Sequence, residues 1–245
     1  PGPMRRWPMR RKREEEVVVR EADAEKAIDA VGFGRFHLQM FLIVGLLMAA
    51  DTVEISFISF VTAVLREEWG LGASERATME AMIFVGMFLG APAWGWLADK
   101  FGRRHVMLAS ATLVSLFGFL TAACQNSGQL IPCRMMVGFS CSGLVVAFDV
   151  FVEVLPTDSR GPWTMAVFYW FTVGSLYSNV CAKFFLCSAG WRFVTVLSAL
   201  PTLVAAVAGY FLVLESVHWL VAARKCEEAA QQLNKIAKRN GSNLR

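Results

Sequence analysis

Several ionisable side chains lie well inside long apolar stretches of this sequence, where a charge is costly and usually marks function. Asp51 and Glu54 stand three residues apart, so a helix places both on one face. Arg134 and Asp149 share a later stretch. At about 1.5 Å per residue, Glu54 and Arg134 lie roughly 12 Å and 7 Å from the same side of their stretches, close enough to meet.

We therefore expect Arg134 to pair with Glu54 or with Asp51. One of these carboxylates would then exchange a proton or a cationic substrate. The alternative is a static buried ion pair that only sets the register between two helices.

The elements that carry these residues are apolar enough for a membrane. Hydrophobic residues make up 56% of the chain, charged residues 18%, and the mean hydropathy is +0.47. Runs of about twenty apolar residues match a helix that crosses a hydrocarbon core, and lipid excludes open strand edges. We expect an all-α membrane protein, a bundle of six transmembrane helices at about 38–62, 78–98, 105–125, 129–155, 163–187 and 191–214.

The polar segments fall at the two ends of the chain. Residues 222–239 have the pattern of an amphipathic helix, with Leu233 and Ile236 on its apolar stripe. We expect three parts: a basic and acidic cytoplasmic tail (1–35), a transmembrane domain (36–215) and the start of a cytoplasmic central linker (216–245).

Cations are distributed unevenly between the two sides of the expected bundle. With the amino terminus inside, nineteen Lys and Arg residues fall on inner segments, and five fall elsewhere. This positive-inside bias predicts that both termini are cytoplasmic. The Asn240-Gly241-Ser242 sequon would then face the cytosol and remain unmodified.

The loop between the second and third runs reads Gly-Trp-Leu-Ala-Asp-Lys-Phe-Gly-Arg-Arg from Gly95 to Arg104. We expect Gly95 to allow close approach of a neighbouring helix and Gly102 to adopt the positive φ of a tight reversal. Asp99 ends one span and can bond nearby amides or cations. Arg103 and Arg104 open the next helix.

This pattern resembles the loop between the second and third helices of major facilitator superfamily transporters, Gly-x-Leu-Ala-Asp-x-x-Gly-Arg-Arg. The segment from Glu153 to Gly161, which contains Pro156 and Arg160, resembles the Glu-x-x-Pro-x-x-x-Arg-Gly signature of the sugar-porter and organic-ion branches. Leu214–Leu220 is similar to the family's Pro-Glu-Ser-Pro-Arg-Trp-Leu, with both prolines and the arginine replaced. The first span, with Ala50-Asp51-Thr52-Val53-Glu54, resembles the synaptic-vesicle-protein-related branch.

The resemblance implies a major facilitator fold built from two six-helix halves, with substrate bound between them. This chain corresponds to the amino-terminal half, and we expect the carboxy-terminal half as its missing partner. It implies transport of a small organic solute by alternating access, coupled to protons or another ion. It also implies that Glu153 and Arg160 join Asp99, Arg103 and Arg104 in a cytoplasmic charge network that acts as a gate.

Two alternatives to transport remain open: a non-transporting membrane receptor or scaffold, and an inactive half-carrier fragment. A polytopic enzyme is disfavoured because the sequence has no nucleophile elbow, phosphate loop or paired catalytic motif, and we expect no cofactor, metal or nucleic acid. The expected partners are a small-molecule substrate, a coupling ion and membrane lipid. Plasma membrane and vesicle membrane are both open, as is a disulfide among the outer cysteines, Cys124, Cys133, Cys181 and Cys187.

Overall fold

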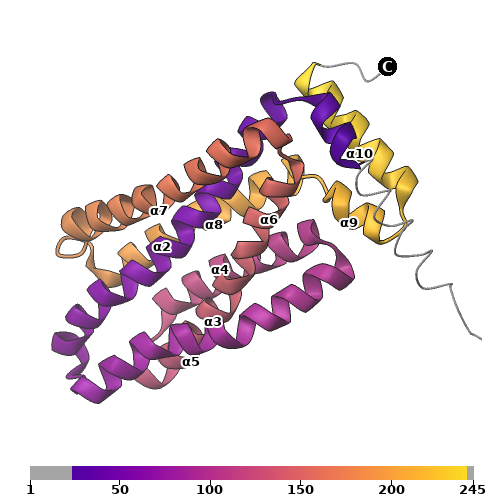
Figure 1. Ribbon diagram of the computed structural model, residues 1–245. Coiled ribbons are helices and arrows are strands. Elements are labelled where there is room, and N and C mark those ends of the chain that lie inside the picture. The colour runs from indigo at the N-terminus through magenta and orange to yellow at the C-terminus, as the bar shows by residue number, and fades with distance from the viewer. Residues whose placement is uncertain (1–23, 242–245) are drawn as a thin grey trace, which may run out of the picture.

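The computed structural model describes residues 24–241, and this part of the chain is a bundle of long helices without a strand (Figure 1). A short helix at residues 24–31 comes first. The labelled elements are α2 (Arg35–Trp69), α3 (Ala73–Phe101), α4 (Arg103–Ala123), α5 (Ser127–Cys141), the 3₁₀ turn η1 (Ser142–Leu144), α6 (Val145–Val154), α7 (Thr157–Phe185), α8 (Gly190–Leu212), α9 (Val217–Ala222) and α10 (Cys226–Asn240).

The six predicted apolar runs correspond to six long helical segments, with α5, η1 and α6 forming one continuous path. Five segments are long and apolar enough to cross a membrane by length and composition: α2, α3, α4, Ser127–Val154 and α8. The predicted run 163–187 falls almost wholly within α7, which has the length but is less apolar, since Trp, Tyr, Ser, Thr and Asn residues interrupt its apolar stretch. The sequence therefore identified every long helix, while α7 is the least lipid-like of them.

The long helices form two groups of three. α2 packs on α7 and α8, while α3 packs on α5 and α4, and contacts of α4 with α8 join the groups (Figure 1). Many large apolar side chains point away from the bundle; Phe88 is 79% exposed and Phe211 is 71% exposed. Such a surface is unfavourable in water but matches hydrocarbon, so these helices form an integral membrane protein.

Small residues allow the closest contact between helices. A Cβ atom on Gly86 would collide with the backbone of Met135, and one on Gly138 would collide with the backbone of Ile83. α3 and α5 therefore meet backbone to backbone, as small residues permit in membrane bundles. This contact sets the position of α5, which carries Arg134.

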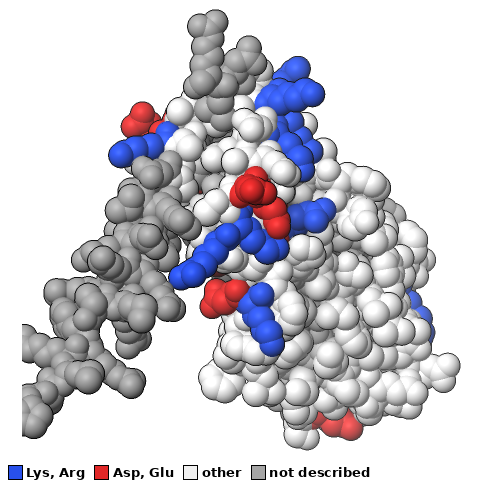
Figure 2. Space-filling model, turned by 90° about the vertical axis from the view of Figure 1, so that its right-hand side faces the viewer, with Lys and Arg blue, Asp and Glu red and all other residues white. Residues whose placement is uncertain are grey.

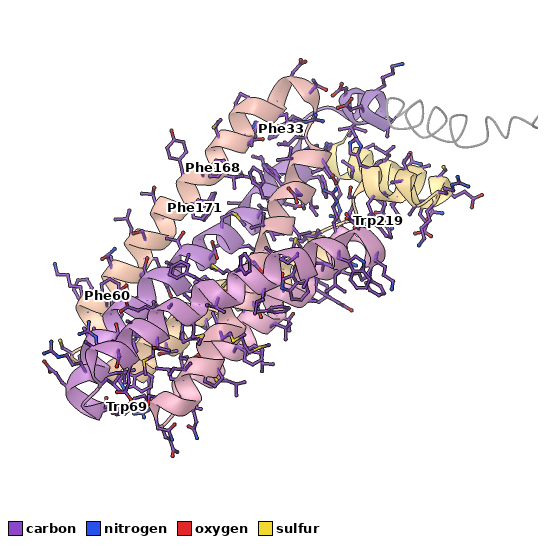
Figure 3. The ribbon with its side chains drawn as sticks, turned by 60° about the horizontal axis from the view of Figure 1, so that its bottom comes forward. Phe33, Phe60, Trp69, Phe168, Phe171 and Trp219 are labelled. Carbon is purple, nitrogen blue, oxygen red and sulfur yellow. The ribbon has the colours of Figure 1, made fainter. Side chains whose placement is uncertain are left out.

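Residues 24–31, α9 and α10 lie together at one end of the bundle, here called the α10 end; the opposite end, near Trp69, is the far end. Figure 3 shows Phe33 and Trp219 at the α10 end and Trp69 at the far end. Ile28, Ile236 and Leu220 belong to the same apolar core as the long helices. The helix at residues 24–31, α9 and α10 therefore pack against the ends of the long helices.

The amphipathic helix is shorter than predicted. It begins at Cys226 rather than at Ala222, because Arg224 adopts a positive φ of 61° and separates α9 from α10. Ile236 is buried and Leu233 packs against the core, as the apolar stripe indicated.

Two polar side chains fasten α10 to the start of α2. The Asn240 amide donates to the Gly32 carbonyl at 3.0 Å, and its oxygen accepts from the Phe36 amide at 3.0 Å. His37 Nδ1 accepts from the Gly34 amide, so Nε2 carries the proton and donates to the Val154 carbonyl at 2.8 Å. The beginning of α2, the end of α6 and the end of α10 are thereby joined.

Candidate functional site

A buried ion pair joins α2 to α5. Arg134 Nη1 donates to Glu54 Oε2 at 3.0 Å, and both side chains are 0% exposed. The guanidinium carbon also lies 5.2 Å from the centre of the Phe57 ring. The sequence left Glu54 and Asp51 open as partners of Arg134, and in the structure the partner is Glu54.

This pair is incompletely satisfied. Within the described residues, Glu54 Oε1 and the Nε and Nη2 atoms of Arg134 are buried without a hydrogen-bond partner. Buried polar atoms are nearly always paired, so three unpaired ones in a single ion pair need an explanation. A purely structural pair would be expected to satisfy them.

Asp51 and Asp149 are not members of this ion pair; they line one cavity of about 390 Å³ between α2, α3 and the α5–α6 segment. Asp51 is almost one helical turn before Glu54, and Asp149 comes from α6. The other lining residues carry no cation: Met87, Ala91, Trp94, Gly95, Cys141, Ser142, Val145 and Val146. Two carboxylates in an otherwise uncharged cavity make it suited to a cation or a proton.

Gly95 does not have the role predicted for it. Among the described residues, a Cβ atom at this position would meet nothing within 4 Å, because Gly95 borders the open cavity and not a neighbouring helix. The prediction for Gly102 is confirmed: its φ is +100°, and α4 begins at the next residue, Arg103.

At the α10 end, Arg103 forms an ion pair with Glu153, and Glu153 also accepts a hydrogen bond from the Ser216 hydroxyl. The Arg103 and Glu153 side chains are 26% and 19% exposed. These contacts join α4, the end of α6 and the residue that caps α9. Two of the predicted charged residues are therefore direct partners.

Arg104 lies outside that ion pair, contrary to the single network expected. Its guanidinium donates to the carbonyls of Val213 and Tyr210 at 2.7 Å each, where the end of α8 leaves carbonyls without helical partners. Its backbone amide donates to Glu215 Oε1 at 2.9 Å. Arg104 therefore holds the end of α8 and does not meet an acidic member of the predicted network.

Glu215 is a functional candidate that the sequence reasoning did not select. Its carboxylate accepts from the amides of Arg104 and Ser216, and its Oε2 lies 3.2 Å from His105 Nδ1. A carboxylate at the start of α4 is favoured by the helix dipole. The sequence signal for Glu215 was the Leu-Glu-Ser segment at 214–216. It matches only part of the family pattern, because the two prolines and the arginine of that pattern are replaced here.

Arg160 and Asp99 also differ from the prediction. Arg160 pairs with Glu25 at 3.2 Å, from the helix at residues 24–31. The Asp99 carboxylate has no hydrogen bond or ion pair within the described residues, and only its carbonyl is used, by Trp219 Nε1 at 2.9 Å. The predicted network is thus divided into separate groups, because each cation is met first by a nearer acid or carbonyl.

A further contact of residues 24–31 lies beside Arg160. Asp29 accepts from the amide of Thr157 at 2.7 Å and from its hydroxyl, at the first residue of α7. These hydrogen bonds, from the backbone amide first, lower the pKa of Asp29 from its ordinary value of 3.8.

These groups surround a cavity of about 610 Å³, lined by Asp99, Arg103, Glu153, Arg160 and His218 with Glu25 and Trp219. Figure 2 shows the charged side chains gathered on this face, while the flank of the bundle is almost entirely uncharged. The five predicted residues other than glycines therefore share one end of the molecule without forming one network.

The comparisons with known proteins agree with this architecture. The profile of the family described as Sugar (and other) transporter matches residues 38–244. The chain is 30% identical over 218 residues to the Synaptic vesicle 2-related protein of Bos taurus, covering 89% of this chain and 40% of that protein. It is 30% identical over 220 residues to the Organic cation/carnitine transporter 7 of Arabidopsis thaliana, covering 90% of this chain and 44% of that protein.

The fold is also found in a solved structure. The xylose transporter XylE from E. coli, in a partially occluded inward-open conformation, superposes with a TM-score of 0.72 at 20% identity, covering 84% of this chain and 56% of that one. The chain spans less than half the length of the two relatives named above. From the family match and the six long helical segments, the chain belongs to the sugar (and other) transporter family of the major facilitator superfamily.

Proposed function

We propose that this chain forms one half of a secondary carrier that moves a small organic solute across a membrane by alternating access. The observation that carries the proposal is the cavity lined by Asp51 and Asp149, close to the unsatisfied Glu54–Arg134 pair. Charges inside a membrane bundle are costly and commonly belong to ion or substrate pathways. The transporter names of several relatives support the same assignment.

The chemistry of the cavity supports coupling to a proton or another cation. Asp51 and Asp149 can each bind a proton or neutralise a cation, and no Lys or Arg of the described residues lines the cavity. Glu54 can exchange Arg134 for a proton when the helices move, because protonation removes the negative charge that faces the guanidinium. Release of the Arg134 pair would then accompany protonation.

The charges at the α10 end act as the gate in this proposal. Arg103–Glu153 and Arg160–Glu25 connect separate elements and are partly exposed to water. Pairs of this kind contribute little individually, so they can break and re-form during a transport cycle. Asp99, whose carboxylate is unpaired within the described residues, is available to a cation of a partner half.

We also infer that the α10 end faces the cytosol, because the Lys and Arg residues concentrate there. The substrate site would be completed by a second six-helix half that covers the cavity side. Reading the transcript onward from the codon for Arg245 tests for this half: six further apolar runs support it, and an early stop codon contradicts it.

The transport test uses the protein together with its second six-helix half, reconstituted into proteoliposomes with an imposed proton gradient, and measures uptake of radiolabelled carnitine and, separately, of xylose. The probes are taken from the names of similar proteins. Asp51→Asn should abolish gradient-driven uptake while the protein still incorporates normally, whereas Asp158→Asn, an exposed carboxylate at the start of α7, should transport normally. Normal coupled uptake by Asp51→Asn would refute the coupling role.

A further inference from the structure

Two thiols meet at the far end of the bundle. Cys124 directly follows α4, and Cys133 lies in the second turn of α5. Their sulfur atoms are 3.8 Å apart, and both cysteines are free. This is the only sulfur–sulfur contact found in the described part of the chain.

The surrounding contacts hold the two thiols in place. The Asn126 side chain caps α5 by accepting from the Gln129 amide at 3.0 Å, which shapes the short turn between the two cysteines. Arg192 of α8 donates to the Cys124 carbonyl at 3.4 Å and pairs with Glu68 of α2. The sulfurs therefore meet in a turn held by two other helices.

The geometry needs only a small adjustment to form a bond. A disulfide has a sulfur–sulfur distance of about 2.05 Å, so the two atoms must approach by roughly 1.8 Å. Rotation about the Cα–Cβ bonds of the two cysteines is the movement that would bring the sulfurs together.

The two thiols differ in their exposure to solvent. Cys124 is 4% exposed, whereas Cys133 is partly exposed. Burial first, and then the neighbouring Cys133 thiol, raise the pKa of the Cys124 thiol to about 11. A reagent from solution therefore reaches Cys133 before Cys124.

We propose that Cys124 and Cys133 form a redox-active dithiol that is converted to an intramolecular disulfide by exchange with a small disulfide, of which oxidised glutathione is the probe. The Cys133 thiolate attacks one glutathione sulfur and releases the first glutathione thiolate. The Cys124 sulfur then attacks the Cys133 sulfur, forms the protein disulfide and releases the second. The protein gives up two protons and two electrons, and one glutathione disulfide becomes two glutathione thiols.

The site has two consequences for the bundle. The bond would link the end of α4 to α5 one residue before Arg134, on the side away from the α10 end. If the far end faces the outer or luminal side, as the proposed orientation requires, the disulfide would form where oxidising conditions prevail. Only this second consequence depends on the proposed function.

The test uses the purified chain in detergent, equilibrated in glutathione buffers of increasing oxidised fraction, quenched with N-ethylmaleimide, digested and analysed by mass spectrometry without reduction. We expect a linked peptide that contains Cys124 and Cys133, both protected from alkylation at the same oxidised fraction. Cys187 and Cys226 are exposed and should form only glutathione adducts. Those adducts show in the same sample that the oxidant was active.

Cysteine-to-serine variants identify which thiols form the bond. The Cys187→Ser/Cys226→Ser double variant should retain the linked peptide, and Cys124→Ser should leave Cys133 as a glutathione adduct. The wild-type measurement alone decides the proposal if Cys124→Ser does not fold. Separate alkylation of Cys124 and Cys133 in buffers that convert Cys187 to its glutathione adduct would overturn the proposal.

Discussion

The Glu54–Arg134 pair and the Arg103–Glu153 pair join the same kinds of charge in opposite surroundings. The first pair is 0% exposed on both sides, and the second is 26% and 19% exposed. In the bundle interior the attraction and the cost of removing water are both large, whereas near water both are small. The two regions therefore respond differently to the loss of one charge.

This difference suits the two proposed roles. A pair that is expensive to leave unpaired changes state only when a proton or another charge compensates, which is the requirement for coupling. A pair with a small contribution can open with each cycle.

Removal of Arg134 should have the largest effect on stability. Arg134→Met leaves Glu54 buried without its partner, and we expect a loss of about 3–5 kcal/mol. The measurement is the thermal unfolding midpoint in detergent. Glu54→Gln/Arg134→Met removes both charges and should recover much of the loss; equal destabilisation of the single and double variants would show that lost packing, not lost charge, is responsible.

The backbone contact between α3 and α5 gives the next largest effect. Gly138→Ala places a Cβ against the backbone of Ile83 and should destabilise by about 1–3 kcal/mol. Gly95→Ala is the matched control in α3: its Cβ meets open space, and replacement of a helical glycine should stabilise by up to about 1 kcal/mol. Unfolding midpoints that shift in the same direction would contradict the assigned packing.

Glu153→Gln should have a smaller effect than Arg134→Met. It removes the charge that faces Arg103 but keeps an acceptor for Ser216, and water screens the pair, so we expect at most about 1 kcal/mol. The difference from wild type should shrink as salt is added, because exposed pairs are screened. If the stability difference between Glu153→Gln and wild type did not change with salt, the Arg103–Glu153 pair would behave like the buried Glu54–Arg134 pair, contrary to this prediction.

The Asp29–Thr157 contact should have the smallest effect, and it should depend on pH. The pKa of Asp29 is lowered in the folded chain, so its stabilisation is present above the ordinary value of 3.8 and is lost as the pH falls through the lowered value. The unfolding midpoints of wild type and Asp29→Asn should therefore differ at neutral pH and converge in acid. A difference between the two unfolding midpoints that widens in acid would contradict a lowered pKa of Asp29.

Much of the fold follows from local patterns. The apolar runs predicted all six long helical segments. In lipid, a single continuous apolar run can satisfy its own backbone hydrogen bonds only as a helix. The helix ends were less accurate: α2 extends from Arg35 to Trp69 beyond the predicted 38–62, since helical hydrogen bonding continues past the apolar core until Gly70, with φ 65°, stops it. The break at Arg224 had no comparable sequence signal.

The sites were predicted less completely than the helices. Spacing on α2 and α5 brought Arg134 to the level of Asp51 and Glu54, but helix rotation determined that Glu54 is the partner. At the α10 end, charge type indicated one network, yet Arg160 pairs with Glu25 and the Arg104 amide donates to Glu215, and neither acid was part of the predicted network. Such pairing depends on which elements are nearest, and that is not a local property.

By itself, the sequence determined the class of the molecule, the long helices, the turn at Gly102 and the residues that carry charge, because hydropathy, chain length and glycine geometry act locally. The tertiary structure decided the partner of each charge, the cavity shared by Asp51 and Asp149, and the meeting of Cys124 with Cys133. These features require helices to be placed against one another, and their distances depend on the rotation and contact of whole helices.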